Sequence, residues 1–283
     1  MEVKILDHQK VLDILPDRDP WAHKGNFGKI LLLCGSRGYT GAAYLAAMGA
    51  LRSGAGLVFL GVPESIYAIE ATKLAEPVVF PLPDEDGKLS AEAIPEILER
   101  LNRMDAVLIG CGLGQSEGTM SVVKTVLEKA ACPVVVDADG INVLVEHKDI
   151  LRGRKYPTIL TPHVGEYNRI SDRACNGDLQ SSAVYLAREL NSIVLLKGHE
   201  TCITDGVTAY SNRTGNPGMA TGGSGDVLAG ILVSLLGQGI PPLEAAACAA
   251  WLHGAAGDIC AADLGQYGML PGDMLNALPR LLK

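Results

Sequence analysis

The sequence predicts an α/β fold in which a mostly parallel sheet lies between two layers of helices, a three-layer sandwich. Short apolar runs rich in β-branched residues recur along the chain and alternate almost without exception with helical patterns. Runs that are apolar on both faces are typical of the buried strands of a parallel sheet. Regular alternation of strand and helix indicates right-handed crossovers, which place helices on both faces of the sheet.

Seven runs are predicted as strands because each is short, apolar and bounded by glycine, proline or polar residues. In chain order they are 29–34 (KILLLC), 57–61 (LVFLG), 77–80 (PVVF), 106–110 (AVLIG), 133–137 (PVVVD), 158–161 (TILT) and 193–197 (IVLLK). Longer segments with helical periodicity or a high content of small residues are predicted as helices: 41–54, 90–104, 119–130, 181–191, 227–236 and 243–262.

One segment interrupts this alternation. Residues 201–212 (TCITDGVTAYSN) form two alternating runs joined by Asp205-Gly206, which is a strong signal for an antiparallel hairpin. The sheet is therefore predicted to be mixed at one edge. No linker, repeat or low-complexity tract interrupts the 283 residues, so we expect a single domain spanning residues 1–283.

Composition excludes several classes of protein. The formal net charge of −8 disfavours a nucleic-acid partner, because phosphate binding requires a basic face. No apolar run reaches the ~18 residues of a spanning helix, and the N-terminus lacks a signal-peptide pattern. Seven cysteines without a CxxC pair indicate reduced thiols rather than disulfides or a zinc site, so we expect a cytoplasmic protein: 34, 111, 132, 175, 202, 248 and 260.

Ligands of open parallel sheets bind outside the carboxyl ends of the strands. The residues after five predicted strands are rich in Gly, Asp, Glu, His and Lys: GSRGYTGAA, CGLGQSEG, ADGIN, PHVGE and GHET. Familiar nucleotide motifs are missing, since no GxxxxGK[ST] occurs and the GxGxxG pattern fails at Gln115 and Glu117. The protein-kinase HRD and DFG motifs are also missing. A nucleotide, if bound, is held in another way.

The stretch 220–226 (ATGGSGD) precedes the apolar run 227–236. Glycines at a helix N-terminus expose backbone N–H groups where the helix dipole adds partial positive charge, which makes an anion site. The alternative is a glycine turn in which Asp226 is only an N-cap or first-turn acid, worth about 1 kcal/mol.

Five motifs together resemble the ADP/ATP-dependent NAD(P)H-hydrate dehydratases of the ribokinase-like superfamily. They are GGSGD at 222–226, LKGHET at 196–201, TPHVGE at 161–166, VVDADGIN at 135–142 and the segment from HKGNFGKILLLCG at 23–35 to Val58. The similarity covers about residues 20 to 280. It implies a ribokinase-like fold, a mostly parallel sheet between helices.

The resemblance implies an enzyme of nicotinamide nucleotide repair. Members of this family remove water from hydrated NADH and NADPH: the C6 hydroxyl is phosphorylated by ADP or ATP, and phosphate is then eliminated. Mg²⁺ is the implied cofactor. A small-molecule kinase of the same superfamily, acting on a vitamin precursor or sugar, is the alternative function. A nucleotide-sensing protein without chemistry is disfavoured by the intact Asp226, and an NAD-dependent oxidoreductase by the missing fingerprint.

The resemblance also implies roles for single residues. Asp226 is the catalytic residue, as a base or an orienting group for the hydroxyl, and it also contacts the substrate. The other implied substrate-binding residues are Ala43 (or its neighbour Ala42), Gly112, Gly114 and His163. The implied nucleotide-binding residues are Lys197, Gly198, His199, Glu200, Thr201, Gly223 and Gly225. Glu166 is the implied Mg²⁺ contact, through water.

Several of these residues have structural alternatives. The alternative for Lys197 is a surface lysine, that for His163 is a structural histidine, and that for Glu166 is a first-turn acid or a solvated loop acid. Asp137 and Asp139 either orient water and metal or cap a turn. Relatives commonly have Pro where this chain has Cys111, a difference that leaves the glycine turn intact.

Expectations about partners also follow from the resemblance. Some family members carry an N-terminal epimerase domain, and about twenty residues before the similarity cannot hold one, so we expect a stand-alone dehydratase with a separate epimerase. ADP is the favoured donor. A homo-oligomer, possibly a tetramer, is expected, with the small-residue helices around 41–56 and 245–262 packing between subunits or within one.

Overall fold

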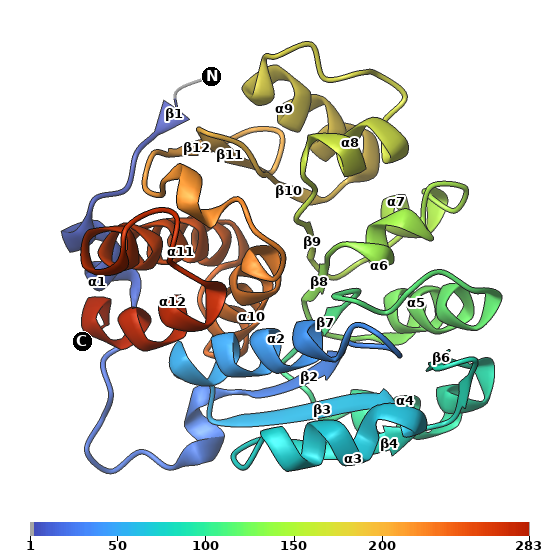
Figure 1. The fold of residues 1–283 in the computed structure, drawn as a ribbon. Coiled ribbons are helices and arrows are strands. Elements are labelled where there is room, and N and C mark those ends of the chain that lie inside the picture. The colour runs from blue at the N-terminus through green and yellow to red at the C-terminus, as the bar shows by residue number, and fades with distance from the viewer. Residues whose placement is uncertain (1–2, 283) are drawn as a thin grey trace.

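The computed structural model describes residues 3–282 and contains twelve strands in two sheets (Figure 1). The strands are β1 (Val3–Lys4), β2 (Lys29–Leu33), β3 (Leu57–Pro63), β4 (Val78–Leu82), β5 (Asp84–Glu85), β6 (Lys88–Leu89), β7 (Ala106–Ile109), β8 (Val134–Val136), β9 (Thr158–Leu160), β10 (Ile193–Leu196), β11 (Thr201–Thr204) and β12 (Ala209–Asn212). Strands β5 and β6 form a small antiparallel sheet, and the others form a ten-stranded sheet in the order β1-β12-β11-β10-β9-β8-β7-β2-β3-β4. All seven predicted strands are present.

The large sheet is parallel except where β11 pairs with β10 and with β12. The predicted hairpin is therefore confirmed. Its turn spans four residues, because Thr204 pairs with Ala209, and the Asp205 carboxylate accepts the N–H groups of Val207 and Thr208 at 2.8 and 2.7 Å. The short β1, which the sequence did not predict, adds in parallel outside β12.

Twelve α-helices accompany the sheets in the described part of the chain. They are α1 (His8–Ile14), α2 (Thr40–Arg52), α3 (Glu64–Lys73), α4 (Ile94–Leu101), α5 (Glu117–Lys129), α6 (Asp139–Asn142), α7 (Asp149–Arg152), α8 (Val164–Ile170), α9 (Leu179–Leu190), α10 (Ser224–Gly237), α11 (Pro242–Leu264) and α12 (Pro271–Ala277). The six predicted helices correspond to α2, α4, α5, α9, α10 and α11. The sequence missed the others, most of which are too short to show a helical period.

The layers follow from the alternation of side chains along the central strands. On β2, Ile30 and Leu32 point into the core formed with α2, α10 and α11, whereas Leu31 and Leu33 point into the core formed with α4, α5 and α9. Figure 1 shows α10, α11 and α12 on one side of the sheet and α5 to α9 on the other. This arrangement confirms the predicted three-layer sandwich and explains why the strands are apolar on both faces.

Small residues let α10 and α2 approach closely. A methyl group on Gly230 would lie 2.2 Å from the carbonyl oxygen of Ala46, and one on Gly49 would lie 2.8 Å from that of Val227. Twelve residues of α11 are also buried in the single chain. These small-residue helices thus pack within the subunit, which accounts for their composition without a partner. The contact holds α10 closely against α2.

A helix must be both long and apolar to cross a membrane. The longest helix in the described part of the chain is α11, with 23 residues. None of the helices within residues 3–282 combines the length and the apolar character needed to cross a membrane.

Candidate active site

Four neighbouring parallel strands end beside the start of α10, and their following residues meet there. Cys111 follows β7, Asp137 follows β8, Thr161 follows β9 and Lys197 follows β10. Asp226, in the first turn of α10, completes the group. These five residues are up to 115 positions apart in the sequence, and parallel pairing brings them together because their strands end at one edge.

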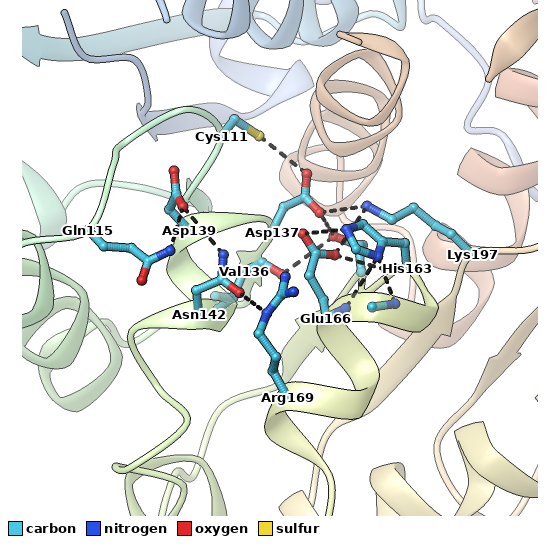
Figure 2. Close-up of polar contacts among 12 residues, drawn as sticks. Cys111, Gln115, Val136, Asp137, Asp139, Asn142, His163, Glu166, Arg169 and Lys197 are labelled. Carbon is cyan, nitrogen blue, oxygen red and sulfur yellow. Dashed lines mark hydrogen bonds and ion pairs between the residues drawn. The ribbon is translucent and has the colours of Figure 1, made fainter. Parts of the chain in front are cut away.

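Asp137 is the centre of this group (Figure 2). One carboxylate oxygen accepts the Thr161 hydroxyl at 2.7 Å and the Lys197 ammonium at 3.0 Å, and the other accepts the Cys111 thiol at 3.6 Å. The carboxylate is buried, so this ion pair is shielded from water. Asp137 therefore connects three other residues of the site and is not merely a turn cap. Sequence reasoning missed Thr161, although a hydroxyl at the end of the apolar run TILT was a signal.

Asp226 stands at the open end of an otherwise buried helix. Gly223, with φ of +96°, turns the chain into α10 and is its N-cap, without any side-chain cap. Twelve of the fourteen residues of α10 are buried, and only Gly225 and Asp226 keep partial exposure. Asp226 is thus a first-turn acid but not the N-cap, and it faces the strand ends.

The electrostatic environment of Asp226 differs from that of an exposed aspartate. Burial, and next the charge of Asp137, raise the pKa of Asp226 to about 6, whereas a hydrogen bond from Cys111 and the charge of Lys197 lower it. The main cause is that the apolar surroundings of α10 remove water from the carboxylate. At neutral pH the group is mostly ionised and is a stronger base than an ordinary aspartate.

Lys197 is a cation directed into the site rather than a surface lysine. Its backbone N–H donates to Pro162 O at 2.8 Å and extends the pairing of β10 with β9, which turns the side chain toward Asp137. Burial lowers the pKa of Lys197, but the charges of Asp137 and Glu166 and the hydrogen bond to Asp137 outweigh it, so the pKa is raised. Lys197 therefore stays charged and available to an anion.

The start of α10 offers a space next to this lysine. The N–H groups of Gly225 and Asp226 find no backbone acceptor among the described residues. A methyl group built on Gly225 would lie 3.5 Å from Lys197 Nζ and 3.8 Å from the Asp137 carboxylate. Free N–H groups, a helix dipole and an ammonium group thus converge on one space, which is an arrangement suited to phosphate.

We expect Gly225→Ala to weaken nucleotide binding at least ~10-fold, because the methyl group occupies the space next to Lys197, and an affinity ratio of ten corresponds to about 1.4 kcal/mol. Folding should be preserved, since both contacts of the methyl group are ordinary van der Waals distances and Gly225 is helical. Calorimetric titration with ADP measures the effect. Gly222→Ala is the matched control, because a methyl group there meets nothing within 4 Å; equal affinity in both variants would contradict the prediction.

His163 and Glu166 form a capping box at the start of α8. The His163 Nδ1 accepts the N–H groups of Gly165 and Glu166 at 2.9 and 3.2 Å, and Glu166 accepts the N–H of His163 at 2.9 Å. Glu166 is buried and its carboxylate lies 3.9 Å from Lys197 Nζ. His163 is therefore a structural histidine and Glu166 a first-turn acid, the structural alternatives that the sequence left open. The His163 ring remains 55% exposed, although its Nε2 lies 3.4 Å from Glu166 Oε1.

The glycine turn after β7 lies against the start of α2. A methyl group on Gly112 would be 2.7 Å from the Cβ of Ala42, so two of the predicted substrate segments do meet. Ala43 is fully buried, and only its backbone could reach a ligand. Asp139 accepts the N–H of Gly114 at 2.8 Å and thereby caps this turn, the second of its two alternatives.

The remaining nucleotide candidates lie in the turn between β10 and β11. The Thr201 hydroxyl donates to the Gly198 carbonyl at 3.2 Å, which closes the turn on itself. His199 and Glu200 are exposed, and Glu200 pairs with Arg213 at 3.4 Å. Lys197 therefore reaches the Asp137 group, whereas His199 and Glu200 face solvent.

Metal ligands are available in the same place. Cys111, Asp137 and Asp226 each offer one ligand atom, and these atoms lie within 4.8 Å of one another. Carboxylates suit Mg²⁺, which usually binds one or two of them together with phosphate oxygens. The pKa of the Cys111 thiol is raised well above its usual value by a hydrogen bond with Cys34, by burial and by the nearby carboxylates, so the thiol is protonated and acts as a donor.

A separate cavity lies at the other edge of the sheet. Its volume is about 640 Å³, and Lys29 and Leu57, the first residues of β2 and β3, line it together with α4. The five-residue group is at the opposite, carboxyl edge. We place the candidate site at the carboxyl edge, because the converging charges and free N–H groups are found there.

The chain is similar to known proteins over almost its whole length. The family model for NAD(P)H-hydrate dehydratase matches residues 30–280. The chain is 45% identical over 276 residues to the bifunctional NAD(P)H-hydrate repair enzyme Nnr of Moorella thermoacetica, covering 95% of this chain and 52% of that protein. It thus spans about half the length of several curated relatives.

Other relatives match along their whole length. The ADP-dependent (S)-NAD(P)H-hydrate dehydratase of Bacillus subtilis is 35% identical, covering 100% of this chain and 99% of that protein. A crystal structure of the Bacillus subtilis ADP/ATP-dependent enzyme, co-crystallised with ATP and Mg²⁺, superposes with a TM-score of 0.85 at 32% identity, covering 99% and 98% of the two chains. An Arabidopsis thaliana ribokinase, at a TM-score of 0.60 and 16% identity, shares the fold alone. The fold is ribokinase-like, and the chain belongs to the NAD(P)H-hydrate dehydratase family.

Proposed function

We propose that this protein catalyses the ADP- or ATP-dependent dehydration of hydrated NADH and NADPH, which restores the usable cofactors. One observation carries the proposal: Asp226, with a pKa of about 6, lies beside the free N–H groups of α10 and the Lys197–Asp137 pair. A base next to a phosphate-binding space is what phosphorylation of a hydroxyl requires. Full-length similarity to the Bacillus subtilis dehydratase supports the choice of substrate.

In the proposed reaction Asp226 accepts the proton of the hydroxyl at C6 of the hydrated ring, and the hydroxyl oxygen takes the terminal phosphoryl group of the nucleotide. The C6–O bond then breaks as the ring nitrogen donates its electron pair, phosphate leaves, and loss of a proton from C5 restores the double bond. Phosphorylation is needed because hydroxide is a poor leaving group. ADP is thereby converted to AMP.

Other residues hold the reactants in place. The N–H groups of Gly225 and Asp226 and the ammonium of Lys197 bind the phosphoryl oxygens and stabilise their charge during transfer. Asp137, held by Thr161 and Cys111, orients Lys197. The exposed part of the His163 ring and the Gly112 turn contact the substrate, while Gly198 to Thr201 border the nucleotide.

Mg²⁺ fits this proposal because three carboxylates, those of Asp137, Glu166 and Asp226, face a single ammonium group in the site. When bound, the ion would neutralise nucleotide phosphate charge and polarise the transferring group. Glu166 would hold it through water, since its Oε2 already accepts the N–H of His163 and its Oε1 lies 3.4 Å from His163 Nε2.

The test is incubation of the protein with chemically hydrated NADH or NADPH plus ADP or ATP and Mg²⁺. We expect the absorbance of the dihydronicotinamide ring to recover while free phosphate is released in equal amount. A small-molecule kinase would instead accumulate a phosphorylated product and release no phosphate. Absence of recovery with both donors would refute the proposed function.

The cellular setting is also a proposal. A cytoplasmic location is supported by the seven cysteines, none of which forms a disulfide and six of which are buried. A functional link to an NAD(P)H-hydrate epimerase is supported by the bifunctional name of the Moorella relative. A homo-oligomer remains part of the proposal, and sedimentation velocity tests it.

A further inference from the structure

His253, on α11, contacts Ser224, the first residue of α10, next to the proposed phosphate space. Its Nε2 lies 2.9 Å from the carbonyl oxygen of Ser224 and 3.2 Å from the hydroxyl oxygen of the same residue. Ser224 is buried and directly precedes Gly225. The histidine belongs to none of the five motifs and is not used in the mechanism above.

The two contacts determine the protonation of the ring. A carbonyl oxygen can only accept, so the Nε2 of His253 carries the hydrogen and donates it. Burial lowers the pKa of His253 to about 4, a hydrogen bond with the Ser224 backbone opposes this, and the charge of Lys197 lowers it further. The ring is therefore neutral at physiological pH, with its hydrogen on Nε2.

The same geometry orients the Ser224 hydroxyl. Because the nearby Nε2 is a donor, the Ser224 oxygen is an acceptor in that contact, and its own hydrogen is left for another partner. The hydroxyl is in the first turn of α10, next to the residue whose methyl group would meet Lys197. A hydroxyl donor at this place lies within two residues of the free N–H groups of Gly225 and Asp226.

The start of α10 needs such an anchor. Its N-cap is a glycine and provides no side-chain hydrogen bond, and Gly222, Gly223 and Gly225 surround Ser224. Glycines allow many backbone conformations, whereas phosphoryl transfer requires a fixed one. Among the described residues, His253 is the side chain that holds this turn by hydrogen bonds from another helix.

We propose that His253 is a positioning residue for phosphoryl transfer: through its Nε2–H it fixes the Gly223–Asp226 turn and leaves the Ser224 hydroxyl free to donate to the phosphate. This inference rests on the proposed function. It adds a residue of α11 to the site and gives Ser224 a direct contact with the nucleotide or the transferred group.

The decisive comparison is between His253→Ala and His253→Gln. Gln can place an amide N–H near the position of Nε2, whereas Ala cannot. We expect His253→Ala to lower kcat ~10–100-fold, the size of loss that a misplacement of about 1 Å produces. His253→Gln should recover at least half of that loss on a logarithmic scale. Ser224→Ala should lower kcat and weaken ADP binding together, because the donor itself is lost.

His8→Ala is the matched control, since the His8 ring also packs on α11, stacked on Trp251 at 5.2 Å. We expect its kcat to be unchanged. Thermal unfolding of each variant tests for loss of folding, and the proposal is overturned if kcat of His253→Ala is unchanged or if the Gln and Ala variants are equally impaired. ¹⁵N NMR of the imidazole reports the tautomer without any activity. A ring protonated on Nδ1 would overturn the inference, whereas inactivity of the wild-type protein on hydrated cofactors would overturn the proposed function alone.

Discussion

Replacing Asp226 with Asn is expected to abolish dehydration, with kcat reduced by ~10²–10⁴-fold, the usual range for loss of a general base. The amide keeps the shape of the side chain but cannot accept the proton of the C6 hydroxyl. Nucleotide affinity should change less than about threefold, an amount worth about 0.6 kcal/mol, because the N–H groups of α10 and Lys197 remain. Steady-state kinetics and calorimetric titration of ADP separate the two effects. Undiminished turnover would remove Asp226 from the reaction.

The same substitution should stabilise the protein above pH 6. The folded-state pKa of Asp226 is about 6, above the ordinary 3.8, so ionisation of this group opposes folding. This destabilisation is absent below pH 3.8, grows as the pH rises from 3.8 to 6, and is complete above pH 6. Its upper bound is about 3 kcal/mol, from 1.36 kcal/mol per pKa unit. Urea unfolding at pH 8 and at pH 4 measures this, and a gain at pH 4 alone would contradict it.

Replacing Lys197 with Met is expected to destabilise the protein by about 3–5 kcal/mol at neutral pH, because it leaves the Asp137 carboxylate buried without its cation. Met keeps most of the apolar stem, so the effect reports the lost charge. ADP binding should also weaken by at least ~10-fold, since the ammonium beside Gly225 is removed. Denaturant unfolding and ADP titration are the measurements.

Arg280→Met is the control for Lys197. Arg280 pairs with Asp263 at 3.1 Å, but both side chains are about 60% exposed, so the cost should be below about 1 kcal/mol. Similar losses of stability in the two variants would show that the burial of the Lys197–Asp137 pair has no energetic consequence. Full ADP affinity in a folded Lys197→Met protein would remove Lys197 from the nucleotide site.

Local patterns were sufficient for the elements and for much of the site. The apolar runs from KILLLC to IVLLK predicted seven strands, and Asp205-Gly206 predicted the hairpin, because these signals depend on neighbours a few residues apart. Strand ends in a parallel sheet meet at one edge, so Asp137, Lys197 and Asp226 could be expected near one another from the sequence alone. The proposed identity of the substrate came from the resemblance to a known family, since the spacing of residues alone does not identify a substrate.

The sequence by itself thus determined the α/β architecture and the edge of the sheet at which the site lies, because strand periodicity and parallel pairing are encoded locally. Only the tertiary structure decided that Asp226 is shielded from water, that Asp137 is held by Thr161, Lys197 and Cys111, and that His253 braces Ser224. The pKa of a carboxylate depends on the water removed from it and on charges within a few ångströms. Those neighbouring groups come from segments far apart in the chain. They can therefore be identified only once the packing of the elements is known.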